Sequence, residues 1–308
     1  MIPLLRPKKP NFGAAERALA DLNQPGEYAN GGVVSAYVQS FVGGLLTSSG
    51  TAALFLAVKA LRVKTVALPE YTHEGTIRAV QLAGCRAVVM PVSPLNPILE
   101  AHDIPDGVDA AIVVAPFGWH INFDSYRDLD IPVIFDLAGA YPQRPQEPED
   151  NWQWCYSFHA TKRIHCGEGG AVCSPNADYM HRHLILRSFG YGGGNFKMSE
   201  INAAFLIGQV DREIPNDRAQ TLMHYFDKIP TASVPLTALN PSSISLCVLK
   251  LDKSLPEKLA KFGIQSKQYF PGLLSNGKFD DWIALPSDVN SEERGHVVEC
   301  VKECLNLK

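Results

Sequence analysis

The sequence predicts an α/β protein in which a mainly parallel sheet is covered by helices and is followed by a small α+β unit. Between residues 45 and 175, short and almost wholly apolar runs alternate with helix-like segments, as is typical of parallel strands buried on both faces. After about residue 215 this alternation gives way to a smaller α+β pattern. We therefore expect a large domain over residues 1–214, including an N-terminal arm, and a small C-terminal domain over residues 215–308.

The expected elements follow from local apolar patterns. The expected strands of the large domain are 65–68, 87–90, 111–114 and 133–135. The expected helices are 51–61, 76–82, 178–187 and 198–210. In the small domain, strands are expected over 244–251 and 264–269. The last helix is expected to begin at Asn290 or Ser291, because acidic residues then occupy its first turn, where the helix dipole favours them.

Composition and charge argue against several kinds of partner. The 308 residues carry a formal net charge of −4 and no basic stripe with interleaved aromatic residues, so neither nucleic acid nor an anionic membrane is expected to bind. The seven cysteines are scattered without a CxxC pair, which indicates reduced thiols rather than a zinc or redox motif. No apolar run is long enough for a signal peptide or a membrane span. We therefore expect a cytoplasmic protein without a metal site.

Lys162 is the most informative residue. It ends the run SFHATK at 157–162, and the glycine-rich turn GEGG follows at 167–170. An amine between a short apolar strand and a flexible turn is typical of a nucleophile that captures a carbonyl group. Because lysine is protonated at neutral pH, burial or a cationic neighbour must lower its pKa, and Arg163 is the expected neighbour. The alternative is a solvated Lys-Arg pair at a strand end.

Polar residues also follow other expected strands, at the edge where such sheets bind ligands. Ser49, Gly50 and Thr51 precede a helix whose free N–H groups and dipole attract a phosphate, unless Ser49 or Thr51 merely caps the helix. Asp136 ends an apolar run. A protonated ring nitrogen would balance its buried charge, although an aspartate here can also cap the next turn.

Two further residues complete the pattern. His73 lies just beyond a strand end, where it can stack on a planar cofactor, act as a general base or lie in a surface loop. Asn195 lies in a glycine-rich loop that either reaches a phosphate across a dimer interface or simply connects two segments. Phosphate donors, a stacking ring, a carboxylate and an amine, spread over one parallel-sheet domain, together indicate a site for pyridoxal 5′-phosphate.

These residues resemble those of the fold-type-I pyridoxal phosphate enzymes, and specifically the DegT/DnrJ/StrS-type sugar aminotransferases. The resemblance covers most of the chain. It rests on the segments 2–4, 6–7, 49–54, 136–140, 157–162, 167–170, 194–200, 203–204, 209, 263–264 and 269–271. It implies a fold-type-I transferase whose large domain has a seven-stranded type of sheet.

The resemblance also implies a role for each site residue. Lys162 would form the internal aldimine with the cofactor and later move a proton between the substrate and cofactor carbons. Asp136 would keep the ring nitrogen protonated, and His73 would stack on the ring. The expected phosphate ligands are Gly50, Thr51, Ser157 and, from the other subunit of a homodimer with shared sites, Asn195.

The implied reaction is a ping-pong transfer of an amino group, usually from glutamate, to a keto sugar that is often nucleotide-linked. Glu168 and Tyr191 are the expected substrate contacts. Two alternatives are a dehydratase or other eliminating enzyme of the same family and a cofactor-binding regulatory protein with little turnover. In the family's dehydratases a histidine replaces the lysine, so Lys162 favours transamination.

Three features depart from the family pattern. Gly139 stands where glutamine or histidine is usual, so a contact near the phenolic oxygen of the cofactor is expected to be missing or replaced. His73 stands where a larger aromatic residue is common. The chain is also shorter than is usual for the family, chiefly in loops and in the small domain.

Overall fold

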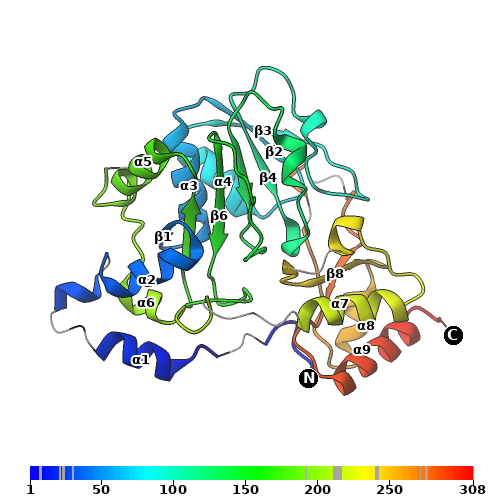
Figure 1. The fold of residues 1–308 in the computed structure, drawn as a ribbon. Helices are drawn as coiled ribbons and strands as arrows, with labels where there is room; N and C mark the ends of the chain where they lie inside the picture. The colour runs from blue at the N-terminus through cyan, green and yellow to red at the C-terminus, as the bar shows by residue number, and fades with distance from the viewer. Residues whose placement is uncertain are drawn as a thin grey trace.

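The computed structural model contains two β-sheets (Figure 1). It describes residues 1–6, 9–20, 22, 25–29, 31–191, 193–210, 217–239, 243–270, 272–274 and 277–307. Within these residues the strands form a seven-stranded sheet in the order β1-β7-β6-β5-β4-β2-β3 and a three-stranded sheet in the order β8-β10-β9. In the large sheet, β7 runs antiparallel to its neighbours, whereas β2 to β6 are parallel. The expected α/β class with a mainly parallel sheet is confirmed.

The four expected strands of the large domain are present, and three more complete its sheet. These strands are β1 Leu45–Thr47, β2 Thr65–Pro69, β3 Arg86–Met90, β4 Ala110–Val114, β5 Val133–Asp136, β6 Trp152–Ser157 and β7 Gly170–Cys173. The strands of the small sheet are β8 Cys247–Lys250, β9 Lys267–Gln268 and β10 Trp282–Leu285.

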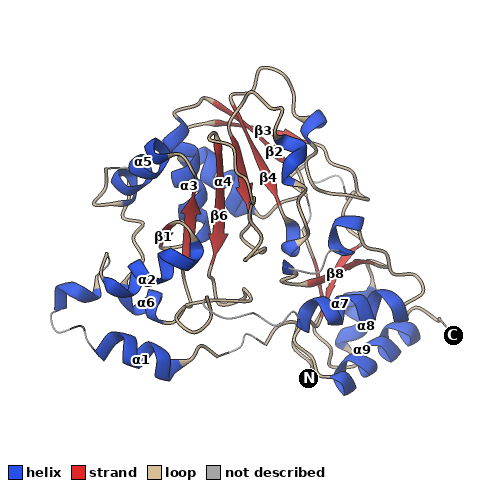
Figure 2. Ribbon diagram, in the orientation of Figure 1, coloured by secondary structure: helices blue, strands red, loops and turns tan. Residues whose placement is uncertain are grey.

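Helices cover both faces of the large sheet (Figure 2). The helices are α1 Phe12–Ala20, α2 Val33–Val42, α3 Gly50–Leu61, α4 Glu74–Leu82, α5 Ala177–Arg187, α6 Glu200–Ala204, α7 Asp217–Lys228, α8 Leu255–Ala260 and α9 Ser291–Cys304. In β5, Ile134 belongs to the hydrophobic cluster under α3 and α4, whereas Val133 and Phe135 belong to the cluster under α2 and α6. Successive strand residues point to opposite faces, so every residue of β5 is buried.

Three expected elements are shorter than the sequence predicts. The helix expected over 198–210 ends at Ala204, and turns with i+3 hydrogen bonds continue to Gly208, whose φ of +74° breaks the helical path. The strand expected over 244–251 is only β8. The strand expected over 264–269 is only β9, because Ile264 forms a parallel bridge with Ile2 instead.

The N-terminal arm lies against the small domain. Ile2 donates its N–H to Gly263 and accepts one from Gln265, and Leu4 and Leu5 pack on the core around the small sheet. Figure 1 accordingly shows the N-terminus beside α9. The expected domain boundary at 214/215 falls within 211–216, outside the described residues.

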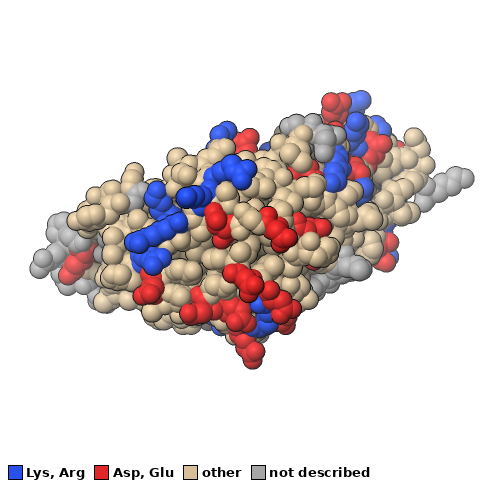
Figure 3. Space-filling model, turned by 90° about the horizontal axis from the view of Figure 1, so that it is seen from above, with Lys and Arg blue, Asp and Glu red and all other residues tan. Residues whose placement is uncertain are grey.

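The described charged side chains and cysteines are distributed as follows. On the face shown in Figure 3, described basic and acidic side chains lie in separate small groups rather than in one continuous basic surface. All seven cysteines are described and form no disulfide. No described helix is long and apolar enough to cross a membrane, and the described residues contain no cluster of three or more potential metal ligands.

Candidate active site

Asp136 is a buried carboxylate at the carboxyl end of β5. Its side chain accepts hydrogen bonds from Thr76 Oγ1 at 2.8 Å and from the backbone N–H of Ala138 at 3.1 Å. Burial raises the pKa of Asp136, whereas these two hydrogen bonds and the charges of Lys162 and His73 lower it. Both donors are neutral, so no ion pair with a described residue balances the charge. The carboxylate is therefore suited to a cationic ligand.

Thr76 holds Asp136 from the first turns of α4. Its hydroxyl also contacts, at 2.8 Å, the hydroxyl of Thr72, which lies four residues earlier and just before α4, and both threonines are buried. The chain Thr72–Thr76–Asp136 fixes the orientation of the carboxylate. The sequence analysis did not identify either threonine. Thr72 precedes α4, so the contact between the two threonines depends on how the chain enters the helix and not on a helical spacing.

We expect Thr76→Val to lower the free energy of unfolding by about 1.5–3 kcal/mol, the usual worth of a hydrogen bond to a charged group. Valine has the size of threonine but cannot donate to Asp136. Thr76→Ser is the control, because it keeps the hydroxyl. Urea denaturation of the cofactor-free protein measures the effect, and equal midpoints for the valine and serine variants would contradict it.

Lys162 lies in a tight turn after β6. Its N–H donates to His159 O at 2.9 Å, and Ala160 N donates to Gly167 O at 2.8 Å. Burial lowers the pKa of the Lys162 amine, Asp136 raises it and Arg218 lowers it. The sequence analysis proposed Arg163 as the cation acting on Lys162, but the structure gives this role to Arg218, because α7 places its charge near the amine. Burial also lowers the pKa of Arg163, to about 10.

The N-terminus of α3 packs closely against the end of β6. Ser49 is its N-cap and accepts the N–H of Ala52 at 3.1 Å, as the alternative interpretation predicted. The Ser49 hydroxyl hydrogen stays available for donation. A Cβ atom on Gly50 would lie 2.7 Å from Ser157 Cβ, so only glycine permits this approach. The structure thus brings Ser157 to the helix terminus where a phosphate was expected.

His73 and Thr51 lie near each other at the start of α4. His73 is the exposed N-cap of α4, and its Nδ1 accepts the N–H of Gly75 at 2.9 Å. Its ring meets that of Phe270 edge to face, with centroids 5.9 Å apart. A Cβ on Gly75 would lie 2.9 Å from Thr51 Oγ1, so Thr51 is next to this turn. The structure therefore brings His73, Thr51, Asp136 and Lys162 into one region.

The small domain fills the space beside Gly139. A Cβ atom on Gly139 would lie 2.9 Å from Ser245 Oγ. Ser245 N donates to Phe117 O at 2.8 Å, and Gly118, with a φ of +85°, would place a Cβ only 2.0 Å from Ser243 O. Residues 243–245 thus pack directly on the loops that follow β4 and β5. There is no room for the longer side chain that the family pattern has at position 139.

We expect Gly139→Ala to lower the free energy of unfolding by about 1–3 kcal/mol, as overpacking usually does. The added methyl group would collide with the Ser245 hydroxyl. Gly295→Ala in α9 is the matched control, because a Cβ there meets nothing within 4 Å and alanine favours the helix. Thermal unfolding compares the two, and the prediction fails if both variants are at least as stable as the wild type.

The other predicted site residues lie at the surface. Glu168 is exposed, and its carboxylate is 3.6 Å from His159 Nε2. Tyr191 is 78% exposed and Asn195 is also exposed. Neither side chain hydrogen-bonds to a described residue of the Lys162 region. Their expected contacts with a substrate and with a second subunit remain predictions.

A separate cavity lies away from these residues. It has a volume of about 600 Å³ and is lined by residues 120–124, 127 and 142–147. None of the predicted site residues lines it. The convergence of Asp136, Lys162 and the α3 N-terminus, rather than this cavity, marks the candidate active site.

Comparison with known proteins identifies the family. The model of the DegT/DnrJ/EryC1/StrS aminotransferase family matches residues 32–291. The chain belongs to this family. This DegT-family protein is 29% identical over 189 residues to the dTDP-4-amino-4,6-dideoxy-D-glucose transaminase of Shigella dysenteriae, covering 54% of the chain and 51% of the relative. It spans about half the length of the curated relatives that it matches.

Solved structures share the fold of the DegT-family protein. The sugar aminotransferase CalS13 from Micromonospora echinospora superposes with a TM-score of 0.82 at 21% identity, over 98% of this chain and 100% of that one. NtdA from Bacillus subtilis, solved with bound cofactor PMP, superposes with a TM-score of 0.83 at 17% identity, over 96% and 82%. These likenesses confirm the expected fold-type-I transferase architecture.

Proposed function

We propose that this DegT-family aminotransferase uses pyridoxal 5′-phosphate to transfer an amino group, from glutamate, to a keto sugar. One observation carries the proposal: the Asp136 carboxylate is buried at the carboxyl end of β5, beside the Lys162 amine, and only neutral groups among the described residues donate hydrogen bonds to it. Family membership supports the transfer of amino groups. The PMP bound to NtdA, the aminated form of this cofactor, supports the cofactor.

The residues present fit the cofactor. Asp136 lacks a cationic partner among the described residues, and a protonated pyridine nitrogen would supply one. The cofactor aldehyde would bind Lys162, and its phosphate would lie at the α3 N-terminus against Gly50, Thr51 and Ser157. When bound, the cofactor supplies an electron-accepting ring that stabilises the carbanion formed next to the substrate nitrogen.

The chain's own residues then have defined tasks. Lys162 Nζ takes a proton from one carbon and returns it to another, which requires the neutral amine that burial favours. Asp136 would keep a proton on the ring nitrogen, because such a cation would stabilise the buried carboxylate. We infer that His73 would contact the cofactor ring. Because Gly50 has no side chain, the start of α3 can approach Ser157 closely.

The proposed acceptor rests on the names of the curated relatives, and the proposed substrate and subunit contacts rest on where the residues lie in the fold. The matched curated relatives are named as transaminases of amino-deoxy sugars, which supports a keto sugar as acceptor, free or nucleotide-linked. We infer contacts with substrate from Glu168 and Tyr191. Asn195, exposed before α6, suits a homodimer in which it reaches the partner's cofactor. We also infer two domains that meet near residue 215, with the N-terminal arm extending from the large one onto the small one.

A two-step spectroscopic experiment tests the function. The purified protein is loaded with pyridoxal 5′-phosphate, and its visible absorbance is recorded before and after glutamate is added. We expect the visible band to disappear with glutamate and to return when a keto sugar is added, so a panel of free and nucleotide-linked keto sugars identifies the acceptor. A visible band that no amino donor changes would instead favour a regulatory protein with little turnover.

A further inference from the structure

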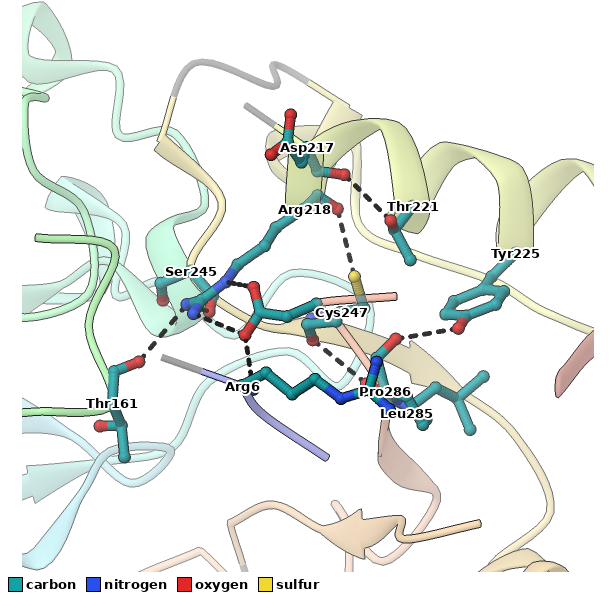
Figure 4. A network of polar contacts seen from close by, with 12 residues as sticks. Arg6, Thr161, Asp217, Arg218, Thr221, Tyr225, Ser245, Cys247, Leu285 and Pro286 are labelled. Atoms are coloured by element: carbon teal, nitrogen blue, oxygen red, sulfur yellow. Dashed lines mark hydrogen bonds and ion pairs between the residues drawn. The ribbon is translucent and has the colours of Figure 1, made fainter. Parts of the chain in front are cut away.

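Arg218, at the start of α7, is a buried cation outside the group that would hold the cofactor. Its side chain is 7% exposed. Nε and Nη2 donate to the two carboxylate oxygens of Asp288 at 2.7 and 2.9 Å. Nη1 donates to the backbone carbonyl of Ser245 and, at 3.4 Å, to that of Thr161. Figure 4 shows the guanidinium pointing away from α7 toward Thr161 and Ser245.

Several distant segments meet at this guanidinium. Asp288 lies just before α9, and its carboxylate also accepts the backbone N–H of Arg6 at 2.9 Å. The N-terminal arm, the turn before Lys162, α7 and two segments of the small domain therefore share one network. An arginine can do this because its planar fork presents several donors in fixed directions, which the single ammonium of lysine does not. A buried ion pair is by itself weak evidence of stabilisation, so its geometry is the informative feature.

The network ends on the turn that carries Lys162. Thr161 O belongs to the peptide unit that joins Thr161 to Lys162. On the side of the large domain, the same turn is held by the bonds from Lys162 N to His159 O and from Ala160 N to Gly167 O. Arg218 holds it from the small domain. Its charge also acts on the Lys162 amine, since Arg218 lowers the pKa of Lys162 while Asp136 raises it.

We propose that Arg218 is a positioning residue that couples the small domain to Lys162. Locked by Asp288, its guanidinium holds the Thr161–Lys162 peptide so that the amine stays near Asp136. Arg218 does not touch the reacting atoms in this role. The role as a positioning residue rests on the proposed function of Lys162, but the contact itself can be tested without any reaction.

The test compares Arg218→Gln and Arg218→Lys with a matched control, Arg182→Gln. Arg182 also donates to a backbone carbonyl, that of Ala60 at 2.8 Å, but it lies on α5. Hydrogen–deuterium exchange of the cofactor-free protein reports on the Lys162 amide, which is protected by His159 O. The dissociation constant of pyridoxal 5′-phosphate, measured by absorbance, is the second readout.

We expect Arg218→Gln to speed exchange in residues 159–166 at least tenfold and to weaken cofactor binding at least tenfold, while β4 keeps its protection. Arg218→Lys should behave similarly, because it keeps the charge but loses the fork. Arg182→Gln should change neither readout. The proposal is overturned if Arg218→Gln leaves exchange in residues 159–166 unchanged, if exchange rises equally throughout the protein, or if Arg218→Lys restores wild-type affinity.

Removal of Arg218 alone leaves Asp288 buried and unpaired, which can prevent folding. The double variant Arg218→Gln/Asp288→Asn removes both charges and then serves the same test. Neither readout uses an amino acceptor. If no keto sugar reacts, the proposed substrate is contradicted and the positioning role stands. If exchange at 159–166 is unchanged, the positioning role is contradicted and the proposed reaction stands.

Discussion

Lys162→Ala is expected to abolish covalent attachment of pyridoxal 5′-phosphate and to lower the rate of amino transfer at least about 10³-fold, because the variant loses both its nucleophile and its proton carrier. Lys162 is the amine whose pKa burial lowers beside Asp136. Borohydride reduction followed by peptide mass spectrometry measures the attachment. In the wild type, the cofactor mass should appear on the peptide that contains residue 162.

Lys162→Arg is the control for charge and size, because a guanidinium remains cationic and is a poor nucleophile. We expect it to be as inactive as the alanine variant, but more stable because the buried stem is kept. Soaking Lys162→Ala with a small primary amine should restore part of the rate if only the amine is missing. If borohydride fixes the cofactor equally well to Lys162→Ala, the assignment of the nucleophile is wrong.

Asp136→Asn is expected to lower the rate of amino transfer about 10²–10³-fold, the usual effect of losing one preorganised electrostatic contact to developing charge. An amide cannot keep the ring nitrogen protonated, although it can still accept the Thr76 hydrogen bond. Asp136→Glu is the matched control, because it keeps the charge but changes the distance between the carboxylate and the ring nitrogen. Single-turnover reaction with glutamate isolates the step, and a rate within threefold of wild type would remove Asp136 from the mechanism.

Asp136 should also make the stability of the cofactor-free protein depend on pH. Burial raises its pKa above the ordinary value of 3.8, so the folded protein keeps this proton to a higher pH than the unfolded chain does. The contribution of Asp136 to stability is then full below pH 3.8 and is lost as the pH rises through the folded pKa. Urea denaturation at several pH values should show this loss in the wild type and not in Asp136→Asn.

Local patterns were sufficient for β2 to β5 of the large sheet and, to within one residue, for the ends of these strands. The runs 65–68, 111–114 and 133–135 are apolar because helices cover both faces of the sheet, and this burial shows directly in the residue types. Asp136 stands out in the sequence because a carboxylate at the end of such a run is unusual. The helix expected over 198–210 is shorter in the structure, because i+3 turns replace the α-helix after Ala204 and Gly208 has a positive φ.

The contacts between distant segments were not predictable in this way. Arg218 and Asp288 are 70 residues apart, and neither lies in a motif. From the sequence, Arg163 is the expected cation near Lys162, because the two residues are neighbours along the chain. Ser245 beside Gly139 is a similar case: the glycine was noticed as a departure, but what fills its space depends on how the small domain packs.

The amino-acid sequence by itself determined the class of fold, the family and the kinds of groups at the site, because burial and motif spacing are local properties of the chain. The tertiary structure decided which charge acts on Lys162, which hydroxyl orients Asp136 and which residue occupies the space beside Gly139. The physical reason is that pKa values and packing depend on distances in space between groups and on their burial. Those distances are set only when α7, the N-terminal arm and the small domain dock onto the large sheet.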